Sequence, residues 1–233
     1  VLHAAADGPA LLHAIASRAH LLDTERAAAW PIPARQGDTT YLCTTDSGGM
    51  GVSLIQSNAS GFGSWLVEPN TQINLHNRGL GFNLEPGHPA ELTPGNRPPH
   101  TLSPALATRG GQLAAVFGTM GGDAQPQILL QLAARLFRYE QSPALAMHAG
   151  RWALTGPTTG FDTWTASSGP LVEIEGHAPP EWAAALTARG HVVSVRPEYD
   201  SDFGHAQVIT RDANGFWAGA SDPRARVGSG AGG

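Results

Sequence analysis

Apolar residues recur along most of this chain in short runs, and the spacing within the runs alternates between helical and extended. Near-helical spacing predicts helices over 8–30, over 126–139 after Pro126, and over 180–189. Short alternating or continuous apolar runs predict strands at 40–46, 51–57, 113–117, 171–174, 192–195, 206–210 and 216–220. Turn residues at 47–49 and 212–215 join neighbouring strands into hairpins. The pattern therefore predicts a mixed α/β fold with antiparallel hairpins rather than an alternating βαβ series.

The interval 58–104 is a long segment rich in glycine, proline and asparagine, with short strand-like pieces such as 72–75. Loops of this length inside a compact domain are usually functional or disordered. The aromatic and ordered-turn residues in this one indicate that it is not a plain linker. The tail 228–233 is predicted to be disordered.

Composition narrows the class of protein. The chain is 41% hydrophobic and 14% charged, as in soluble globular proteins. No run approaches the roughly 18 apolar residues of a membrane span, so no membrane partner is expected. A net charge of −5 with scattered arginines argues against nucleic-acid binding. The chain starts at Val1 without methionine, so an upstream part is expected; the compartment stays open, with the cytoplasm slightly favoured over the periplasm.

Residue usage also excludes some chemistry. All basic residues except histidine are arginine, which excludes lysine Schiff bases, a lysine general base and a P-loop. Cys43 is the single cysteine and alternates with its neighbours as a structural strand residue would. Histidines 76, 88 and 100 have no ligand-like spacing, so neither a metal nor another cofactor is expected.

Asp38-Thr39 lies where the polar connector 34–38 enters an apolar strand. If the chain is cut between these residues, the freed α-amino group, with a pKa of about 7.7–8.0, can serve as the base for the threonine hydroxyl. The alternative is an ordinary strand-starting threonine after a turn.

Two further segments offer polar or backbone groups to a substrate. Gly121 and Gly122 end the run 118–122 at a predicted strand-to-helix junction, where their N–H groups can bind a developing oxyanion. A tight turn is the alternative, and a phosphate loop would need a fuller fingerprint. The proline-rich run 97–104 presents His100 and Thr101 from a rigid backbone.

Taken in order, these segments resemble the C-terminal catalytic subunit of the γ-glutamyltransferase family, the N-terminal-nucleophile enzymes that process γ-glutamyl amides. The resemblance covers about 37–224, and five blocks carry it: 37–41, 57–63, 97–104, 118–122 and 219–224. It implies cleavage between Asp38 and Thr39, with Thr39 as nucleophile. It also implies that Ser57 bonds to the nucleophile and that Gly121 and Gly122 form the oxyanion hole.

The resemblance further implies the architecture and the partner. The expected fold class is α+β, a four-layer αββα sandwich that is incomplete without the large subunit. Residues 1–38 correspond to the end of the large-subunit region and the connector, and 39–227 to the small subunit. The missing large-subunit portion is the expected partner, and the uncleaved fragment alone is expected to be inactive.

The sequence departs from the family pattern at positions that bind the substrate in typical members. Asn58 is displaced by one from a recognition asparagine, and His100-Thr101 replaces a serine pair. Arg78 stands in place of a glutamine and Gly81 in place of an aspartate that faces an ammonium group. This pattern resembles the acylase-like branch, where some relatives accept glutaryl-type acyl groups. Arg78 is thus either a carboxylate ligand or an arginine that lies at the surface or braces the loop.

The leading hypothesis is an amidohydrolase or acyltransferase acting on γ-glutamyl or glutaryl-type amides through a threonyl acyl-enzyme. The first alternative is a catalytically silent scaffold or binding protein that keeps the fold. The second is a protein whose only reaction is its own cleavage.

Overall fold

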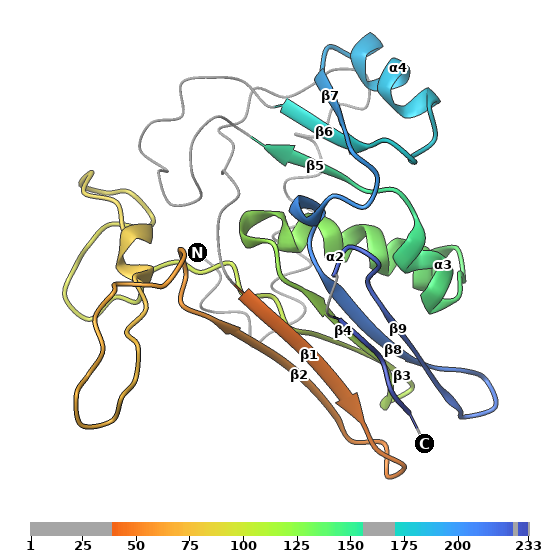
Figure 1. Cartoon of the computed structure of the whole chain (residues 1–233), viewed down its shortest axis with the longest axis horizontal. Helices are drawn as coiled ribbons and strands as arrows, with labels where there is room; N and C mark the ends of the chain where they lie inside the picture. Colours follow the sequence, from red (N-terminus) through yellow and green to blue (C-terminus); the bar gives the residue numbers. More distant parts are fainter. Residues whose placement is uncertain (1–38, 156–170, 226–227, 233) are drawn as a thin grey trace.

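The computed structural model describes residues 39–155, 171–225 and 228–232, and its named strands form three sheets (Figure 1). The predicted helix over 8–30, the connector 34–38 and Asp38 lie outside these residues. A two-stranded sheet is the antiparallel hairpin of β1 (Thr39–Thr45) and β2 (Gly51–Ser57). The predicted pair of strands and their hairpin turn are confirmed.

The four-stranded sheet is antiparallel throughout and has the order β3-β4-β8-β9. Its strands are β3 (Ala105–Arg109), β4 (Gln112–Thr119), β8 (Ala206–Arg211) and β9 (Trp217–Ser221). Gly215, with φ of 90°, closes the predicted turn between the last two strands. The short run after the 97–104 loop was not predicted as a strand, yet β3 forms there because it completes the edge beside β4.

The hairpin and two helices cover opposite faces of this sheet (Figure 1). On one face, the Tyr41 side chain of β1 reaches β4. On the other lie α2 (Gln125–Ala133), which continues as a π-helical turn over Ala134–Arg138, and α3 (Pro143–His148). Buried side chains of β4, β8, α2 and α3, such as Phe117 and Ile128, form the main core together with Phe203 of the 3-10 turn Ser201–Phe203. Burial of each large side chain contributes roughly 1.5–3 kcal/mol to folding.

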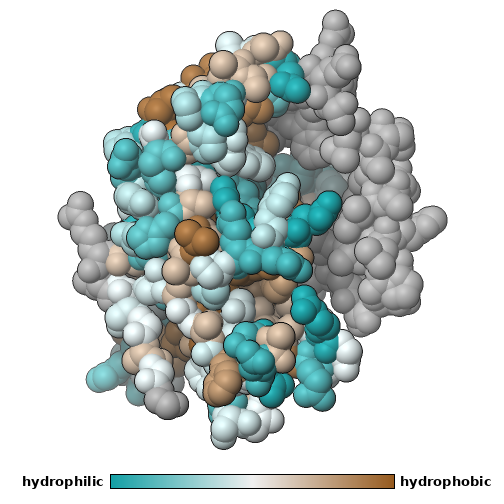
Figure 2. Space-filling view, turned by 90° about the vertical axis from the view of Figure 1, so that its right-hand side faces the viewer, coloured by the Kyte–Doolittle hydropathy of each residue, from teal (hydrophilic) through white to brown (hydrophobic). Residues whose placement is uncertain are grey.

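The third sheet has the order β5-β6-β7, from β5 (Trp152–Thr155), β6 (Leu171–Glu175) and β7 (Val192–Arg196). The β6–β7 pair is parallel and is joined through α4 (Glu181–Ala188). This single βαβ unit was not anticipated, although its three elements were predicted. Figure 1 draws this sheet and α4 at the top of the molecule, and hydrophobic residues lie at the top of the space-filling view (Figure 2).

Helix α3 and strand β5 are additions to the predicted elements, and the fold is mixed α/β as expected. The 58–104 segment contains a short 3-10 helix, η2 (Arg78–Gly81), and isolated bridges such as Val67↔Asn74. The strand predicted at 72–75 is therefore reduced to one bridge. No helix among the described residues is long and apolar enough to cross a bilayer.

Candidate active site

The β1–β2 hairpin places Thr39 directly opposite Ser57. Thr39 Oγ1 donates a hydrogen bond to Ser57 Oγ at 3.1 Å. The turn that sets this register is closed by Asp46, whose carboxylate accepts from the Met50 N–H at 2.9 Å. Because a slip of one residue would exchange the two faces of a strand, the register decides which side chain meets Thr39.

Arg78 extends this pair into a chain of three side chains. Its Nη2 donates to Ser57 Oγ at 3.1 Å, and the residue is only 7% exposed. Nη1 is buried and has no hydrogen-bond partner among the described residues. Burial lowers the pKa of Arg78, but a guanidinium remains charged near neutral pH. The structure therefore rules out the surface position that the sequence had left open for Arg78.

Asn77, which the sequence did not single out, holds Arg78 against the end of β2. Its Oδ1 accepts from the Ser60 N–H at 2.9 Å, and its Nδ2 donates to the Ser60 carbonyl at 3.2 Å. Its own N–H donates to the Asn58 carbonyl at 3.1 Å. The turn after Ser57 is thereby fastened to η2, with Ala59 at φ of 78°. Only the position of Asn77 beside Arg78 hinted at this role.

The glycine run at the end of β4 lies near the same end of β1 as Thr39 (Figure 1). A Cβ on Gly118 would lie 2.2 Å from Tyr41 Cε2, so the bare glycine backbone lets the tyrosine ring lie against β4. Tyr41 follows Thr39 by two residues and so occupies the same face of β1. This contact joins the strand of Thr39 to the strand that leads into the glycine loop.

Gly121 and Gly122 have φ of 137° and 53°, which glycine adopts readily and other residues rarely do. They precede α2 through the 3-10 turn Gly122–Ala124. Neither N–H makes a hydrogen bond to another described residue. The oxyanion role predicted for these two groups stays a prediction.

A segment that no sequence motif singled out packs against this loop. Gly204, at φ of 84°, lies so close that a Cβ there would be 2.6 Å from the Met120 carbonyl oxygen. The carbonyl of His205 accepts from the Met120 N–H at 3.4 Å. Gly204 therefore has to be glycine for reasons of both backbone conformation and space.

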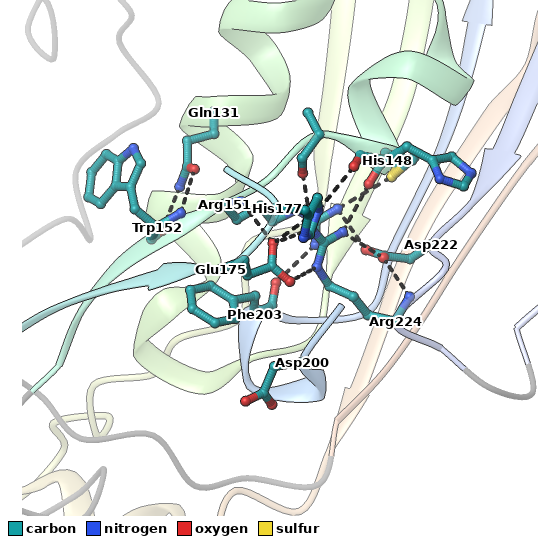
Figure 3. Close-up of polar contacts among 12 residues, drawn as sticks. Gln131, His148, Arg151, Trp152, Glu175, His177, Asp200, Phe203, Asp222 and Arg224 are labelled. Atoms are coloured by element: carbon teal, nitrogen blue, oxygen red, sulfur yellow. Dashed lines mark hydrogen bonds and ion pairs between the residues drawn. The ribbon is translucent and has the colours of Figure 1, made fainter. Parts of the chain in front are cut away.

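A buried ionic cluster fixes that supporting segment (Figure 3). Arg151 Nη1 donates to the Phe203 carbonyl at 2.9 Å, and its Nη2 pairs with Asp222 at 2.7 Å. Asp222 in turn accepts from the Ala206 N–H at 2.8 Å. Burial lowers the pKa of Arg151 to about 10, so it stays protonated at neutral pH. The segment between Phe203 and Ala206 is thus held at both ends by charged groups.

The same cluster fastens the three-stranded sheet to the end of β9. Arg224 forms a fork with the Glu175 carboxylate, through Nε at 2.7 Å and through Nη2 (Figure 3). Arg224 also donates to Asp222 at 3.0 Å, and all three residues are buried. The sequence block 219–224 therefore has a structural role, which the sequence pattern alone did not reveal.

Asp123 follows the glycine pair and is partly buried. Burial raises the pKa of its carboxyl group to about 7. Gln125, fully buried at the start of α2, accepts from the Ser103 N–H at 3.2 Å and so connects the 97–104 loop to the glycine loop. Its Nε2 has no partner among the described residues.

The predicted site residues are therefore only partly brought together. Thr39, Ser57 and Arg78 form one hydrogen-bonded chain. His100 is exposed, and no side-chain hydrogen bond joins His100, Thr101 or Asn58 to that chain. Their roles as substrate ligands stay predictions, as does cleavage after Asp38.

This arrangement is suited to nucleophilic chemistry on an acid-bearing substrate. A hydroxyl at a strand start is hydrogen-bonded to a second hydroxyl, which accepts from a buried guanidinium. One terminal nitrogen of that guanidinium has no hydrogen-bond partner in the described part of the chain. Among the described residues, no group of three or more His, Cys, Asp or Glu side chains is placed to hold a metal ion.

The sequence model of the gamma-glutamyltranspeptidase family matches residues 11–232. The oxamate amidohydrolase proenzyme of Klebsiella pneumoniae is 38% identical over 203 residues, covering 87% of this chain and 37% of that protein. The glutathione hydrolase-like YwrD proenzyme of Bacillus subtilis is 36% identical over 187 residues, covering 80% of this chain and 34% of that protein. The chain thus spans little more than a third of the length of these relatives.

A solved structure agrees with these sequence matches. The cephalosporin acylase from Bacillus halodurans superposes with a TM-score of 0.72 and is 35% identical, covering 91% of this chain and 37% of that one. Both sequence relatives are proenzymes by name.

Proposed function

The chain belongs to the gamma-glutamyltranspeptidase family, and on that premise we propose that it carries the nucleophile of a self-cleaving amidohydrolase or acyltransferase. The nucleophile is Thr39. The observation that carries this proposal is the hydrogen bond of 3.1 Å between Thr39 Oγ1 and Ser57 Oγ at the start of β1. The proenzyme names of the relatives support processing before the threonine.

The reaction begins with the Thr39 α-amine, freed by cleavage after Asp38, acting as base. Thr39 Oγ forms a bond to the amide carbonyl carbon while the hydroxyl proton passes to the α-amine. The N–H groups of Gly121 and Gly122 bind the oxyanion of the tetrahedral intermediate. The carbon–nitrogen bond then breaks, and the leaving nitrogen takes the proton from the α-amine. Water, or an amine acceptor, attacks the threonyl ester, which releases the acyl product and restores the hydroxyl.

The proposed substrates are amides whose acyl part bears a carboxylate, such as γ-glutamyl or glutaryl-type amides. The free donor of Arg78 supports this class because a guanidinium binds carboxylates through paired N–H groups. The related proteins named as an oxamate amidohydrolase and a glutathione hydrolase-like protein are both named for substrates that carry carboxylates. His100, Thr101 and Asn58 are further proposed contacts to the substrate.

The proposed assembly is a heterodimer with the remainder of the same precursor. Because the chain spans 37% of the length of the oxamate amidohydrolase proenzyme, the remainder is large enough to be a second subunit. In the assembled enzyme we propose a four-layer αββα sandwich of the N-terminal-nucleophile type. The similarity to the cephalosporin acylase supports this architecture.

Intact mass of the full-length precursor, purified and incubated, tests the nucleophile. Two fragments that divide between Asp38 and Thr39 are expected for the natural sequence, and one unbroken chain for Thr39→Ala. Thr39→Ser keeps a hydroxyl and an α-amine, so it should cleave more slowly and retain some amide hydrolysis. A natural sequence that never cleaves, or that cleaves but turns over no amide, would favour the scaffold or the self-processing protein instead.

A further inference from the structure

Ser57 Oγ faces more hydrogen-bond donors than a hydroxyl oxygen has lone pairs. The Thr39 hydroxyl, the Ala59 N–H and Arg78 Nη2 all donate to it, each at 3.1 Å. A hydroxyl oxygen has two lone pairs. The backbone N–H and the guanidinium can only donate, whereas the threonine hydroxyl can also accept. The contact from Thr39 is therefore the one that can change direction.

Cleavage before Thr39 gives its hydroxyl proton another acceptor. The neutral α-amine has a lone pair, and three covalent bonds separate its nitrogen from Oγ1 of the same residue. When the Thr39 proton turns to this amine, Ser57 can donate its own proton to Thr39 Oγ1, while Arg78 and the Ala59 N–H occupy both lone pairs of Ser57. This arrangement requires an uncharged amine, because an ammonium group has no lone pair.

Arg78 lies close enough to disfavour the ammonium form. Two hydrogen bonds of 3.1 Å connect Thr39 Oγ1 to Arg78 Nη2 through Ser57 Oγ, so these atoms are at most about 6 Å apart. The α-amine nitrogen lies at most about 4 Å further away, which is the span of three single bonds. Because like charges repel more strongly as they approach, this upper limit on the distance sets a lower limit on the repulsion.

No anion offsets the charge of Arg78 in the described part of the chain. The residue is 7% exposed, and none of the ion pairs found there includes it. Burial lowers the pKa of the guanidinium, which nevertheless stays charged near neutral pH. Because buried charges are screened less than exposed ones, Arg78 acts on its neighbours more strongly than a surface arginine does.

Titratable groups on the strands around Thr39 add little to this field. The strands β2 and β4 carry none. On β1, burial raises the pKa of Tyr41 and of Cys43, so both are uncharged at neutral pH. Asp46 is exposed in the turn after β1, and Arg211 is exposed at the last position of β8, so solvent screens both charges.

Two further titratable groups lie in the neighbouring loops. His76 precedes η2 and is exposed, and its Nδ1 accepts from the Arg78 N–H at 3.2 Å. Asp123 follows the glycine pair, and burial raises the pKa of its carboxyl group to about 7. An ionised Asp123 would favour the ammonium form of the Thr39 α-amine. Its effect is thus opposite in sign to that of Arg78, and a variant can separate the two.

We infer that Arg78 is a positioning residue for the nucleophile: its charge keeps the Thr39 α-amine uncharged, and its hydrogen bond to Ser57 directs the Thr39 hydroxyl proton to that amine. This inference rests on the proposed function, since cleavage before Thr39 creates the amine. The proton moves from Thr39 Oγ1 to the amine nitrogen as Oγ1 forms its bond to the carbonyl carbon. The effect needs no carboxylate on the substrate.

The first test measures the amine directly. Residues 39–233 contain no lysine, so after cleavage the Thr39 α-amine is the single amine within them. Reductive methylation with formaldehyde and cyanoborohydride modifies neutral amines, and intact mass of this fragment gives its rate against pH. An ordinary α-amine has a pKa of about 7.7–8.0. We expect a pKa about 1 lower in the cleaved full-length enzyme.

The second test repeats this titration on variants, after intact mass has established that each one cleaves. Arg78→Gln should raise the pKa of the amine by about 1, and Arg78→Lys should leave it low because the charge is kept. The control Arg109→Gln removes an exposed arginine at the end of β3 and should change nothing. Asp123→Asn should lower the pKa of the amine or leave it unchanged.

The third test separates this effect from a contact with the substrate. The pH profile of kcat/KM for ammonia release from glutaramate reports groups of the free enzyme. Its acid limb should follow the pKa found by methylation and should move up by about 1 in Arg78→Gln. If Arg78 only bound the substrate carboxylate, Arg78→Gln would lower kcat/KM at every pH and leave the acid limb in place. That result would overturn the inference.

The outcomes distinguish the inference from the proposed function. Absence of cleavage, or cleavage without hydrolysis of any amide, overturns the proposed function. An active enzyme whose Thr39 α-amine has an ordinary pKa, or whose pKa is the same in Arg78→Gln, overturns the role of Arg78 and leaves Thr39 as nucleophile. Should the Arg78 variants not cleave, the titration of the natural sequence decides, because an amine in the ordinary range is largely charged at neutral pH.

Discussion

Replacing Gly118 by alanine tests the contact that holds β1, the strand of Thr39, against the four-stranded sheet. The added Cβ would lie 2.2 Å from Tyr41 Cε2 and 2.5 Å from Cζ, whereas carbon atoms in contact normally lie about 3.5–4.0 Å apart. The ring therefore has to withdraw by more than about 1 Å. Tyr41 is 7% exposed, and its hydroxyl hydrogen-bonds to Ser53 at 2.9 Å, so the ring cannot move without moving β1.

The expected magnitude follows from these two contacts. Overpacking of a buried site costs about 1–3 kcal/mol. Weakening of the Tyr41–Ser53 hydrogen bond adds about 1 kcal/mol. The free energy of unfolding should thus fall by about 2–4 kcal/mol, and cleavage before Thr39 should slow because Thr39 lies two residues from the displaced ring.

The assay is thermal or denaturant unfolding of the full-length precursor, with cleavage followed by intact mass. Gly219→Ala in β9 is the matched control, because its Cβ would meet only ordinary contacts at 3.5 Å and 3.7 Å. The double variant Gly118→Ala/Tyr41→Leu should be less destabilised than the two single variants predict when added. If Gly118→Ala and Gly219→Ala unfold alike, and the double variant is additive, this contact does not set the position of β1.

Two further predictions concern the glycine loop. Gly204→Ala should lower kcat by displacing Met120 and Gly121, with a smaller effect on KM, because the loop acts on the transition state; an unchanged kcat in a folded variant would contradict this. Asp123→Asn should stabilise the protein progressively from about pH 4 to about pH 7. The folded pKa of Asp123 is raised to about 7 from its usual 3.8, so protonation favours folding at low pH and this contribution is lost as the pH rises through 7. A difference in Tm between this variant and the natural sequence that does not depend on pH would refute that assignment.

Local pattern was sufficient for much of the fold, whereas the proposal of Thr39 as nucleophile came from the family resemblance. Apolar periodicity located β1, β2, β4, β6, β7, β8, β9, α2 and α4 to within a few residues, because each buries one face or a continuous apolar run. The hairpin turn after Asp46 fixed the register of β1 and β2, and the register alone places Ser57 opposite Thr39. Glycines 121 and 122 could be proposed from the sequence because their backbone angles exclude most other residues.

Tertiary structure decided which residues lie beside Thr39 and which support the glycine loop. Nothing local indicated that Arg78 is buried against Ser57, since these residues are 21 positions apart and a long loop joins them. The same holds for Gly204, whose neighbour Phe203 is held by Arg151 across 52 positions. The physical reason is that hydrophobic periodicity records only which face of an element is buried. Which buried polar groups meet, and which donor remains free for a ligand, is settled only when distant elements pack together.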